Sequence, residues 1–248
     1  SYYFSRDSVL ISQTDGNDFL NNIANSDFGL YDIDQIPQSL DGKKIILFST
    51  EKTIYLTDSV GSFLSSIYSV ENDHIGCLTS NANGDTLYFL QVSSTGSNPV
   101  IMMITINNLN SIAVGSVPKA FSDIRQFKYF NGDFYYLTSG GSFHKISNGN
   151  VSMLDNSSNY SFTVSNGGTL YRVYYSGGNY FLTPSSFGPY QSTIYDIDYS
   201  DLENRMYMYD YDGPKISYWD FNNNTQTILF DANNSYQQTS NRKEQVVH

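Results

Sequence analysis

The 248-residue chain has few of the side chains from which catalytic and metal sites are usually built. Its single cysteine, Cys77, excludes an internal disulfide and a cysteine metal cluster. The wide spacing of His74, His144 and His248 indicates neither a metal triad nor a catalytic base. Sequence motifs of hydrolases and phosphotransferases, such as G-x-S-x-G, H-E-x-x-H and the P-loop, are also missing. We therefore predict no catalytic residue.

Positive charge is scarce as well, with 13 Lys and Arg against 24 Asp and Glu and a formal net charge of -11. Binding of phosphate groups needs clustered Lys and Arg, so we expect neither a nucleic-acid partner nor binding to an anionic membrane surface. Charged residues make up 15% of the chain, and Ser, Asn, Thr and Tyr replace them. An uncharged polar surface is more often found outside cells, and it indicates a secreted or cell-surface protein.

Long hydrophobic segments are the third absence. The chain contains no run of about 18 apolar residues, which a membrane-spanning helix would need. Its first residues, "SYYFSRDSVL", do not have the charged-then-apolar layout of a signal peptide. We expect no membrane insertion by this chain.

Aromatic residues are abundant, with 22 Tyr and 16 Phe, and they favour strands. Polar turns followed by apolar runs recur along the chain, with spacings of about 36 to 47 residues between successive runs. This spacing is typical of the blades of a β-propeller. The first apolar residues of these runs are Ile45, Leu87, Phe134, Leu170 and Met206.

A further apolar run precedes each of these starts and one or two follow it, which matches the four-stranded plan of a blade. Residues 1–24 supply three strands of another unit, and residues 244–248 could pair beside Tyr2 to Phe4 and close the ring. We expect a polar turn at 147–161. The sequence thus predicts an all-β, six-bladed propeller in a single domain, 1–248. A β-sandwich pair and a five-bladed propeller with a frayed terminus are the alternatives.

The segment from residue 205 to residue 230 carries a resemblance to a known family. The residues that carry it are Tyr207, Asp210, Lys215 and Ile216, an Asn-rich turn at 222–224 and an apolar strand at 227–230. They resemble the YWTD propellers of the low-density-lipoprotein-receptor family and their bacterial and protist relatives. The Trp of the motif is absent, and a near-motif at 55–58 falls in a different strand of its blade. The resemblance implies the six-bladed architecture and no particular ligand.

A duplicated "YDID" supplies the candidate metal ligands. Alternation along a strand places Asp32 and Asp34 on one face, and Asp196 and Asp198 on one face of another strand. Four carboxylates near a channel mouth would suit Ca²⁺, which needs several oxygen ligands. In the alternative interpretation, Asp34 and Asp198 cap the turn after the innermost strand.

Tyrosines crowd the last two predicted blades, and tyrosine is a favoured contact residue at protein interfaces. Packing within the strands is the alternative role for these side chains. The candidate binding residues are Tyr174, Tyr175, Tyr180, Tyr190, Tyr199, Tyr209 and Tyr211, with Tyr218 beside them.

Together these features predict a non-enzymatic, extracellular binding module that presents loops and a tyrosine-rich face to a protein partner. Such a module requires no cofactor. One alternative is a calcium-dependent hydrolase, such as a lactonase, whose channel carboxylates are the four aspartates named above. The other is a glycan-binding lectin, although aromatic and polar positions do not recur identically between blades.

Overall fold

The computed structural model describes residues 32–231, apart from 41–42, 50–51, 59–62, 82–83, 96–97, 107, 166, 185–193, 201–202 and 211–214. Within residues 32–65 it describes the side chains of 52–55 only, and it does not describe the side chain at 230. Among these residues, none of the helices has the length and hydrophobicity needed to cross a membrane.

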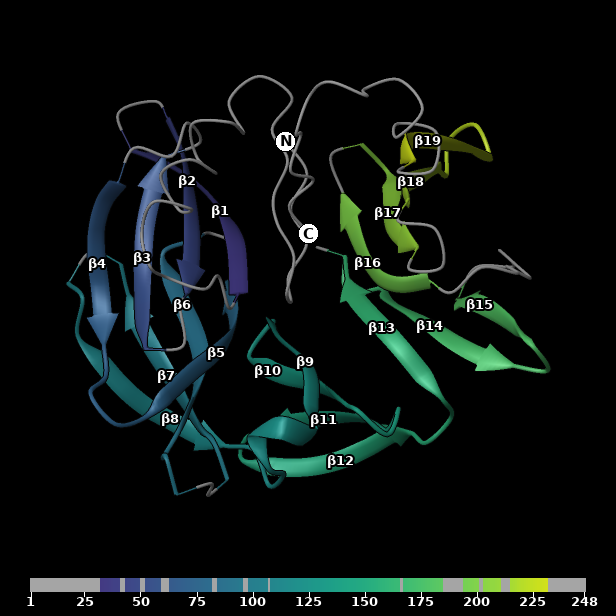
Figure 1. Cartoon of the computed structure of the whole chain (residues 1–248). Coiled ribbons are helices and arrows are strands. Elements are labelled where there is room, and N and C mark those ends of the chain that lie inside the picture. The colour runs from purple at the N-terminus through teal and green to yellow at the C-terminus, as the bar shows by residue number, and fades with distance from the viewer. Residues whose placement is uncertain are drawn as a thin grey trace, which may run out of the picture. The chain divides into compact units, whose positions relative to one another are not determined.

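The described regular structure consists of antiparallel strands and one short 3₁₀ turn, Phe121–Asp123 (Figure 1). The strands form four four-stranded sheets and one three-stranded sheet. In each sheet the strands pair in the order in which they occur along the chain. The first two sheets contain β1 (Asp32–Leu40), β2 (Lys43–Ser49), β3 (Thr53–Asp58) and β4 (Phe63–Ser69), and then β5 (His74–Ser80), β6 (Thr86–Val92), β7 (Val100–Thr105) and β8 (Ser111–Ser116).

The remaining sheets follow the same plan. The third contains β9 (Ile124–Phe130), β10 (Asp133–Thr138), β11 (Phe143–Ser147) and β12 (Asn150–Asp155). The three-stranded sheet contains β13 (Asn159–Val164), β14 (Leu170–Ser176) and β15 (Asn179–Thr183). The last sheet contains β16 (Ile194–Ser200), β17 (Arg205–Asp210), β18 (Lys215–Asp220) and β19 (Thr225–Asp231).

This strand order confirms the predicted repeat. The five predicted run starts fall in β2, β6, β10, β14 and β17, the second strand of each sheet. The apolar runs predicted before them are β1, β5, β9, β13 and β16, the first strands. The near-motif at 55–58 lies in β3, a third strand, as expected.

The described strands differ from the prediction at two places. The prediction of a polar turn over 147–161 is wrong, because β12 occupies Asn150–Asp155 within it. The sheet of β13 to β15 has three described strands where four were predicted. The sixth blade predicted from residues 1–24, and its closure by residues 244–248, lie outside the described residues.

The chain divides into two compact units, with the boundary between Phe134 and Tyr135, inside β10. In the first unit, β5 contacts both β1 and β9. In the second unit, β13 contacts β16. Within each unit, therefore, the first strands of successive sheets lie side by side.

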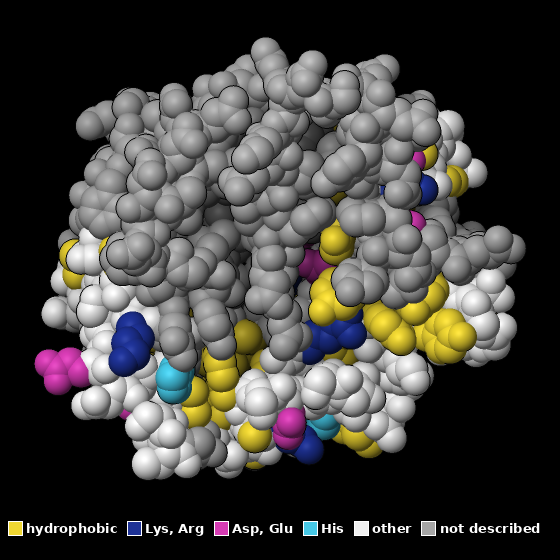
Figure 2. Space-filling view, in the orientation of Figure 1, with side chains coloured by type: hydrophobic (Ala, Val, Ile, Leu, Met, Phe, Trp, Pro, Cys, Tyr) yellow, Lys and Arg dark blue, Asp and Glu magenta, His cyan; other side chains and the backbone are white. Residues whose placement is uncertain are grey.

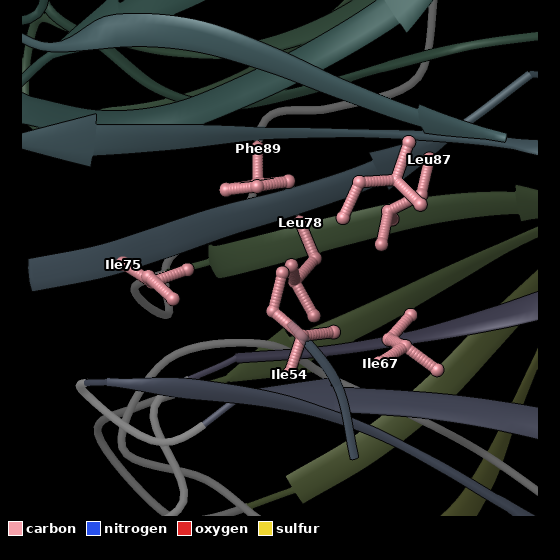
Figure 3. Close-up of a cluster of buried hydrophobic side chains, with 7 residues drawn as sticks. Ile54, Ile67, Ile75, Leu78, Leu87 and Phe89 are labelled. Atoms are coloured by element: carbon pink, nitrogen blue, oxygen red, sulfur yellow. The ribbon is translucent and has the colours of Figure 1, made fainter. Parts of the chain in front are cut away.

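Apolar side chains fill the space between the first two sheets, in the first unit (Figure 3). Ile54, Leu87 and Phe89 have no exposed surface. Full burial of one such side chain contributes about 1.5–3 kcal/mol, so this cluster stabilises the packing of the two sheets. Its members are Ile54, Ile67, Ile75, Leu78, Leu87, Phe89 and Ile104.

The second unit has two corresponding clusters. Leu137, Phe143 and Phe162 form one of them, with the rings of Phe143 and Phe162 4.8 Å apart. The other packs the β13–β15 sheet against the β16–β19 sheet. It contains Val173, Tyr180, Leu182, Ile194, Ile197, Met206 and Met208.

A tight glycine turn precedes β11. The backbone N–H of Gly141 donates to the carbonyl oxygen of Thr138 at 2.9 Å, and Gly141 has a φ of 84°. A Cβ at this position would lie 2.9 Å from the backbone nitrogen of Asn159 and 3.0 Å from the Cα of Ser158. Gly132 has a similar φ of 90° but open space around the corresponding position. The turn at Gly141 therefore packs directly on the start of β13.

Comparison of two substitutions should measure this close approach. Gly141→Ala and Gly132→Ala each carry the cost of a left-handed alanine, about 1–2 kcal/mol. Gly141→Ala adds overpacking against backbone atoms, so we expect its free energy of unfolding to fall by about 1–3 kcal/mol more. Denaturant unfolding of both variants measures the difference, and equal losses would show that the approach at Asn159 is not constraining.

Candidate functional site

Two of the predicted aspartates form hydrogen bonds between neighbouring sheets. Asp196 and Asp198 lie in β16 and alternate with the buried Ile197. The hydroxyl of Ser161 donates to Asp196 Oδ1 at 2.6 Å, and the hydroxyl of Thr163 donates to Asp198 Oδ1 at 3.0 Å. Ser161 and Thr163 belong to β13, so these bonds join the first strands of two sheets.

This arrangement gives the two carboxylates a structural role. The backbone N–H of Ile197 also donates to Ser161 Oγ at 3.1 Å and to Asp196 Oδ1 at 2.9 Å. Asp198 lies inside the ladder, opposite Tyr207, and accepts from Thr163, while its role as a turn cap stays a prediction. The alternation predicted for Asp196 and Asp198 agrees with these bonds, but the hydroxyl partners were not predicted.

The other two predicted metal ligands, Asp32 and Asp34, lie in β1, whose side chains are outside the description. They belong to the first unit, and Asp196 and Asp198 belong to the second. In the part of the chain that is described, no three His, Cys, Asp or Glu side chains are grouped so that they could hold a metal ion. The four-carboxylate calcium site remains a prediction.

The predicted binding tyrosines differ widely in exposure. Tyr175 is 41% exposed, whereas Tyr180 is only 7% exposed and belongs to the core. The prediction of Tyr180 as a surface contact residue is therefore wrong. Tyr190 and Tyr211 lie outside the described residues. The half-buried ones are Tyr174, Tyr199, Tyr209 and Tyr218.

Three tyrosines of the second unit pack together where β13, β14 and β15 meet. Tyr175 lies opposite Tyr180 in the β14–β15 register, with ring centroids 5.0 Å apart. The ring of Tyr160 lies 5.0 Å from that of Tyr180 and 6.3 Å from that of Tyr175. We call Tyr160, Tyr175 and Tyr180 the tyrosine cluster. Hydrophobic side chains gather over β13 and β14 on the face shown in Figure 2.

The tyrosine cluster lies beside the hairpin turn that joins β14 to β15. Ser176, Gly177 and Gly178 are exposed, and the two glycines have φ angles of 57° and 89°. Two successive positive φ angles suit the tight turn of a two-residue hairpin. The segment "YYSGGNY" combines rigid tyrosines with small polar residues, the combination that binding loops of antibodies use.

A second exposed loop, residues 156–158, flanks Tyr175. The backbone N–H of Tyr175 donates to the carbonyl oxygen of Ser158 at 2.9 Å. Asp155 holds the base of this loop, since it accepts from the backbone N–H of Ser157 at 3.0 Å and from Asn159 Nδ2 at 3.2 Å. Arg172, on β14, forms an ion pair with Asp155.

These contacts lower the pKa of the Asp155 carboxyl group. Partial burial by itself would raise the pKa of this carboxyl group. Hydrogen bonds from Ser157, Asn159 and Arg172 outweigh burial and hold the pKa of Asp155 well below its ordinary value. Asp155 is therefore ionised at neutral pH, and it ties the loop at 156–158 to β13 and β14.

No sequence signal pointed to this arrangement. Asp155 and Arg172 are 17 positions apart and lie in different sheets. The buried Asn159 completes the connection, because its Nδ2 donates to the carbonyl oxygen of Gly141 at 2.9 Å and its Oδ1 accepts from Arg172 at 3.3 Å. Such a cluster depends on how two sheets meet, and sequence periodicity does not report that.

No protein-family model and no curated protein matches the chain. Similar solved structures include an oligogalacturonate lyase in complex with manganese, which is 11% identical with a TM-score of 0.56 over 75% of this chain and 62% of that chain. TolB from Acinetobacter baumannii is 18% identical with a TM-score of 0.54, over 74% of this chain and 50% of that chain. An oligogalacturonate lyase from Vibrio parahaemolyticus is 10% identical with a TM-score of 0.54, over 75% and 62%.

The chain thus spans between 50% and 62% of the length of these three structures. Identities of 10% to 18% bear on the fold alone. The resemblance to YWTD propellers at family level stays a prediction. With the sequential four-stranded sheets described above, the comparisons show that the chain has an all-β propeller fold.

The low pKa of Asp155 predicts a specific acid response. Because the folded-state pKa is lowered, this carboxylate stabilises the fold fully above the ordinary carboxyl pKa of about 3.9 and loses that effect as pH falls toward the lowered value. The difference in unfolding free energy between the wild type and Asp155→Asn should be constant from about pH 8 to 5 and shrink below about pH 4.

Urea unfolding across this pH range measures the difference. Asp123→Asn is the matched control, since Asp123 is exposed and lies outside this cluster. If the difference in unfolding free energy between the wild type and Asp155→Asn does not change between pH 7 and 3, the predicted direction of the pKa shift is wrong.

Proposed function

We propose that the protein is a non-enzymatic, secreted or cell-surface binding module that contacts a protein partner through Tyr175, the exposed member of the tyrosine cluster, and the adjoining hairpin turn. The observation that supports it most is the state of Tyr175, whose side chain is 41% exposed while its ring rests on Tyr160 and Tyr180. A large side chain that is already fixed loses little conformational entropy on binding. Tyrosines of this kind are frequent hot spots at interfaces.

The neighbouring polar groups fit the same role. The loop at 156–158 and the turn at 176–178 both expose small polar residues beside Tyr175. Their backbone and hydroxyl groups would offer adaptable hydrogen bonds around a rigid aromatic centre. Asp155 and Arg172 hold the loop in place, so the surface is formed before a partner arrives.

The proposed architecture behind this surface is a six-bladed propeller of the YWTD type, completed by residues outside the description. A second candidate function is a calcium-dependent hydrolase that uses the aspartates of β1 and β16. It draws support from the lyase of similar fold that was solved with manganese. A glycan is the other class of partner, because sugar rings also pack on exposed tyrosines.

Substitution of Tyr175 should separate the binding module from its alternatives. The full chain is immobilised and presented with extracellular proteins of its source organism and, in parallel, with a glycan array. Binding of the captured protein should weaken at least about tenfold in Tyr175→Ser, because a truncated hot spot typically costs 2 kcal/mol or more. Surface plasmon resonance measures the affinity.

Ile228→Ser is the matched control, since Ile228 is 54% exposed on β19 and lies outside the tyrosine cluster. It should bind as the wild type does. If Tyr175→Ser binds every captured protein as tightly as the wild type, the proposed surface is wrong. Specific binding to glycans alone would favour the lectin.

Calcium provides the test of the second candidate. A binding module of the proposed kind should change its melting temperature by less than about 1 °C between millimolar CaCl₂ and excess chelator. A calcium-stabilised protein should gain several degrees, and Asp196→Asn should remove most of that gain. Differential scanning fluorimetry of both proteins gives the answer.

A further inference from the structure

The outer strand of the third sheet, β12, is unusually apolar for an exposed edge. Val151, Met153 and Leu154 are 43%, 60% and 46% exposed. Residues 150–154 carry no charge. Among the described strands, β12 pairs with β11 and ends the sheet. An edge strand usually carries Lys, Pro or an inward charge that prevents pairing with another chain.

The register of β12 shows which backbone groups face outward. Asn148 and Gly149 have φ angles of 49° and 76°, as in the two-residue type I′ turn, and they join Ser147 to Asn150. In an antiparallel ladder, pairs that exchange hydrogen bonds alternate with pairs that do not. Counting from this turn, the N–H and C=O groups of Val151 and Met153 point away from β11.

Val151 and Met153 therefore offer both the backbone groups and the side chains that an added strand would contact. Their backbone groups face outward along the edge, and their exposed side chains lie on one face of the sheet by period-two alternation. An added strand could take up the backbone hydrogen bonds and pack alternate apolar side chains on that face.

Two of the other outer strands, β8 and β19, are less suited to pairing. The register shift in the β7–β8 pair falls between Ile101 and Met102, after three regular pairs of β8. In β19, the regular part before its shift is Thr225–Ile228, in which Ile228 is the one apolar residue. The shift in β12 comes only after Met153, so that Asn150–Met153 forms a regular edge in which Val151 and Met153 are apolar. Bulges bend a strand and interrupt its pairing, so β12 is the best template of the three.

Charge distinguishes between possible occupants of this edge. The whole chain carries a net charge of -11, and a second copy would approach against like charge. A basic segment would be attracted by the same field. The edge itself is uncharged, so its exposed side chains would select the apolar positions of the bound segment. The negative charge of the whole protein would attract the basic positions of that segment.

We propose that β12 binds an extended segment of a partner protein by strand addition, and that this segment is apolar at alternate positions and basic overall. The inference rests on the proposed protein-binding function and names the mode and chemistry of one contact. Its surface is different from the tyrosine cluster in the residues that it uses, so each can be removed by its own substitution.

The test uses a synthetic peptide, Lys-Val-Lys-Val-Thr-Val-Lys, and its acidic twin, in which Glu replaces each Lys. The basic peptide should bind the full chain at least about tenfold more tightly than the acidic twin, and its affinity should fall as salt is added. Binding should slow hydrogen exchange at the backbone amides of Val151 and Met153. Fluorescence anisotropy and NMR-detected exchange measure these two effects.

Val151→Pro removes an outward amide donor without removing a bond to β11, and proline is tolerated at such edge positions. It should weaken peptide binding at least about tenfold. Val151→Thr keeps the donor and a β-branched side chain, and it should bind within about threefold of the wild type. If Val151→Pro does not fold, Val151→Lys replaces it, because a lysine on the edge repels the basic peptide and blocks strand addition.

Equal binding of the two peptides, unchanged exchange at Val151 and Met153, or full binding by Val151→Pro would each overturn the inference. A wild-type dimer in analytical ultracentrifugation that Val151→Pro dissolves would also overturn it, because a second copy would then occupy the edge. Failure here is distinguishable from failure of the proposed function. If only the strand-addition inference fails, binding of a captured partner still depends on Tyr175. If the proposed function fails, binding of a captured partner does not depend on Tyr175.

Discussion

The packing of apolar faces between successive sheets is the interaction on which the rest of the structure depends. A small sheet with an apolar face is not stable alone, and here Phe89, Leu87 and Ile54 bury that face completely against the next sheet. The same arrangement recurs around Phe143 and Phe162 in the second unit. This packing sets the first strands of neighbouring sheets side by side, and it thereby places Ser161 within reach of Asp196.

The candidate binding surface depends on this core through a short series of contacts. Tyr180 belongs both to the apolar cluster and to the tyrosine cluster, so it connects the interior to the exposed ring of Tyr175. Arg172 and Asp155 connect the neighbouring loop to β14 and to the start of β13. Polar groups at the sheet junction hold the surface, while the apolar core determines where that surface lies.

The sequence predicted the strands well and their mutual contacts poorly. Alternation and turn residues located β5 and β17, whose apolar runs lie between clear polar turns. β12 was missed because Asn and Ser surround Val151 and Met153 and hide a short strand at an exposed edge. The burial of Tyr180 and the exposure of its partner Tyr175 were not predictable, since both are tyrosines that lie opposite each other in neighbouring strands. The ion pair of Asp155 with Arg172 depends on packing between sheets.

The bonds between β13 and β16 have one more consequence. The two bonds join Ser161 to Asp196 and Thr163 to Asp198, and in each bond the residues are 35 positions apart. The two strands therefore run in the same direction in fixed register. Residues inserted in the loops between them would leave both bonds intact. One residue inserted within either strand would turn the hydroxyls or the carboxylates toward the opposite face. Among relatives of this protein, length variation should therefore collect in the connecting loops and spare the first strands.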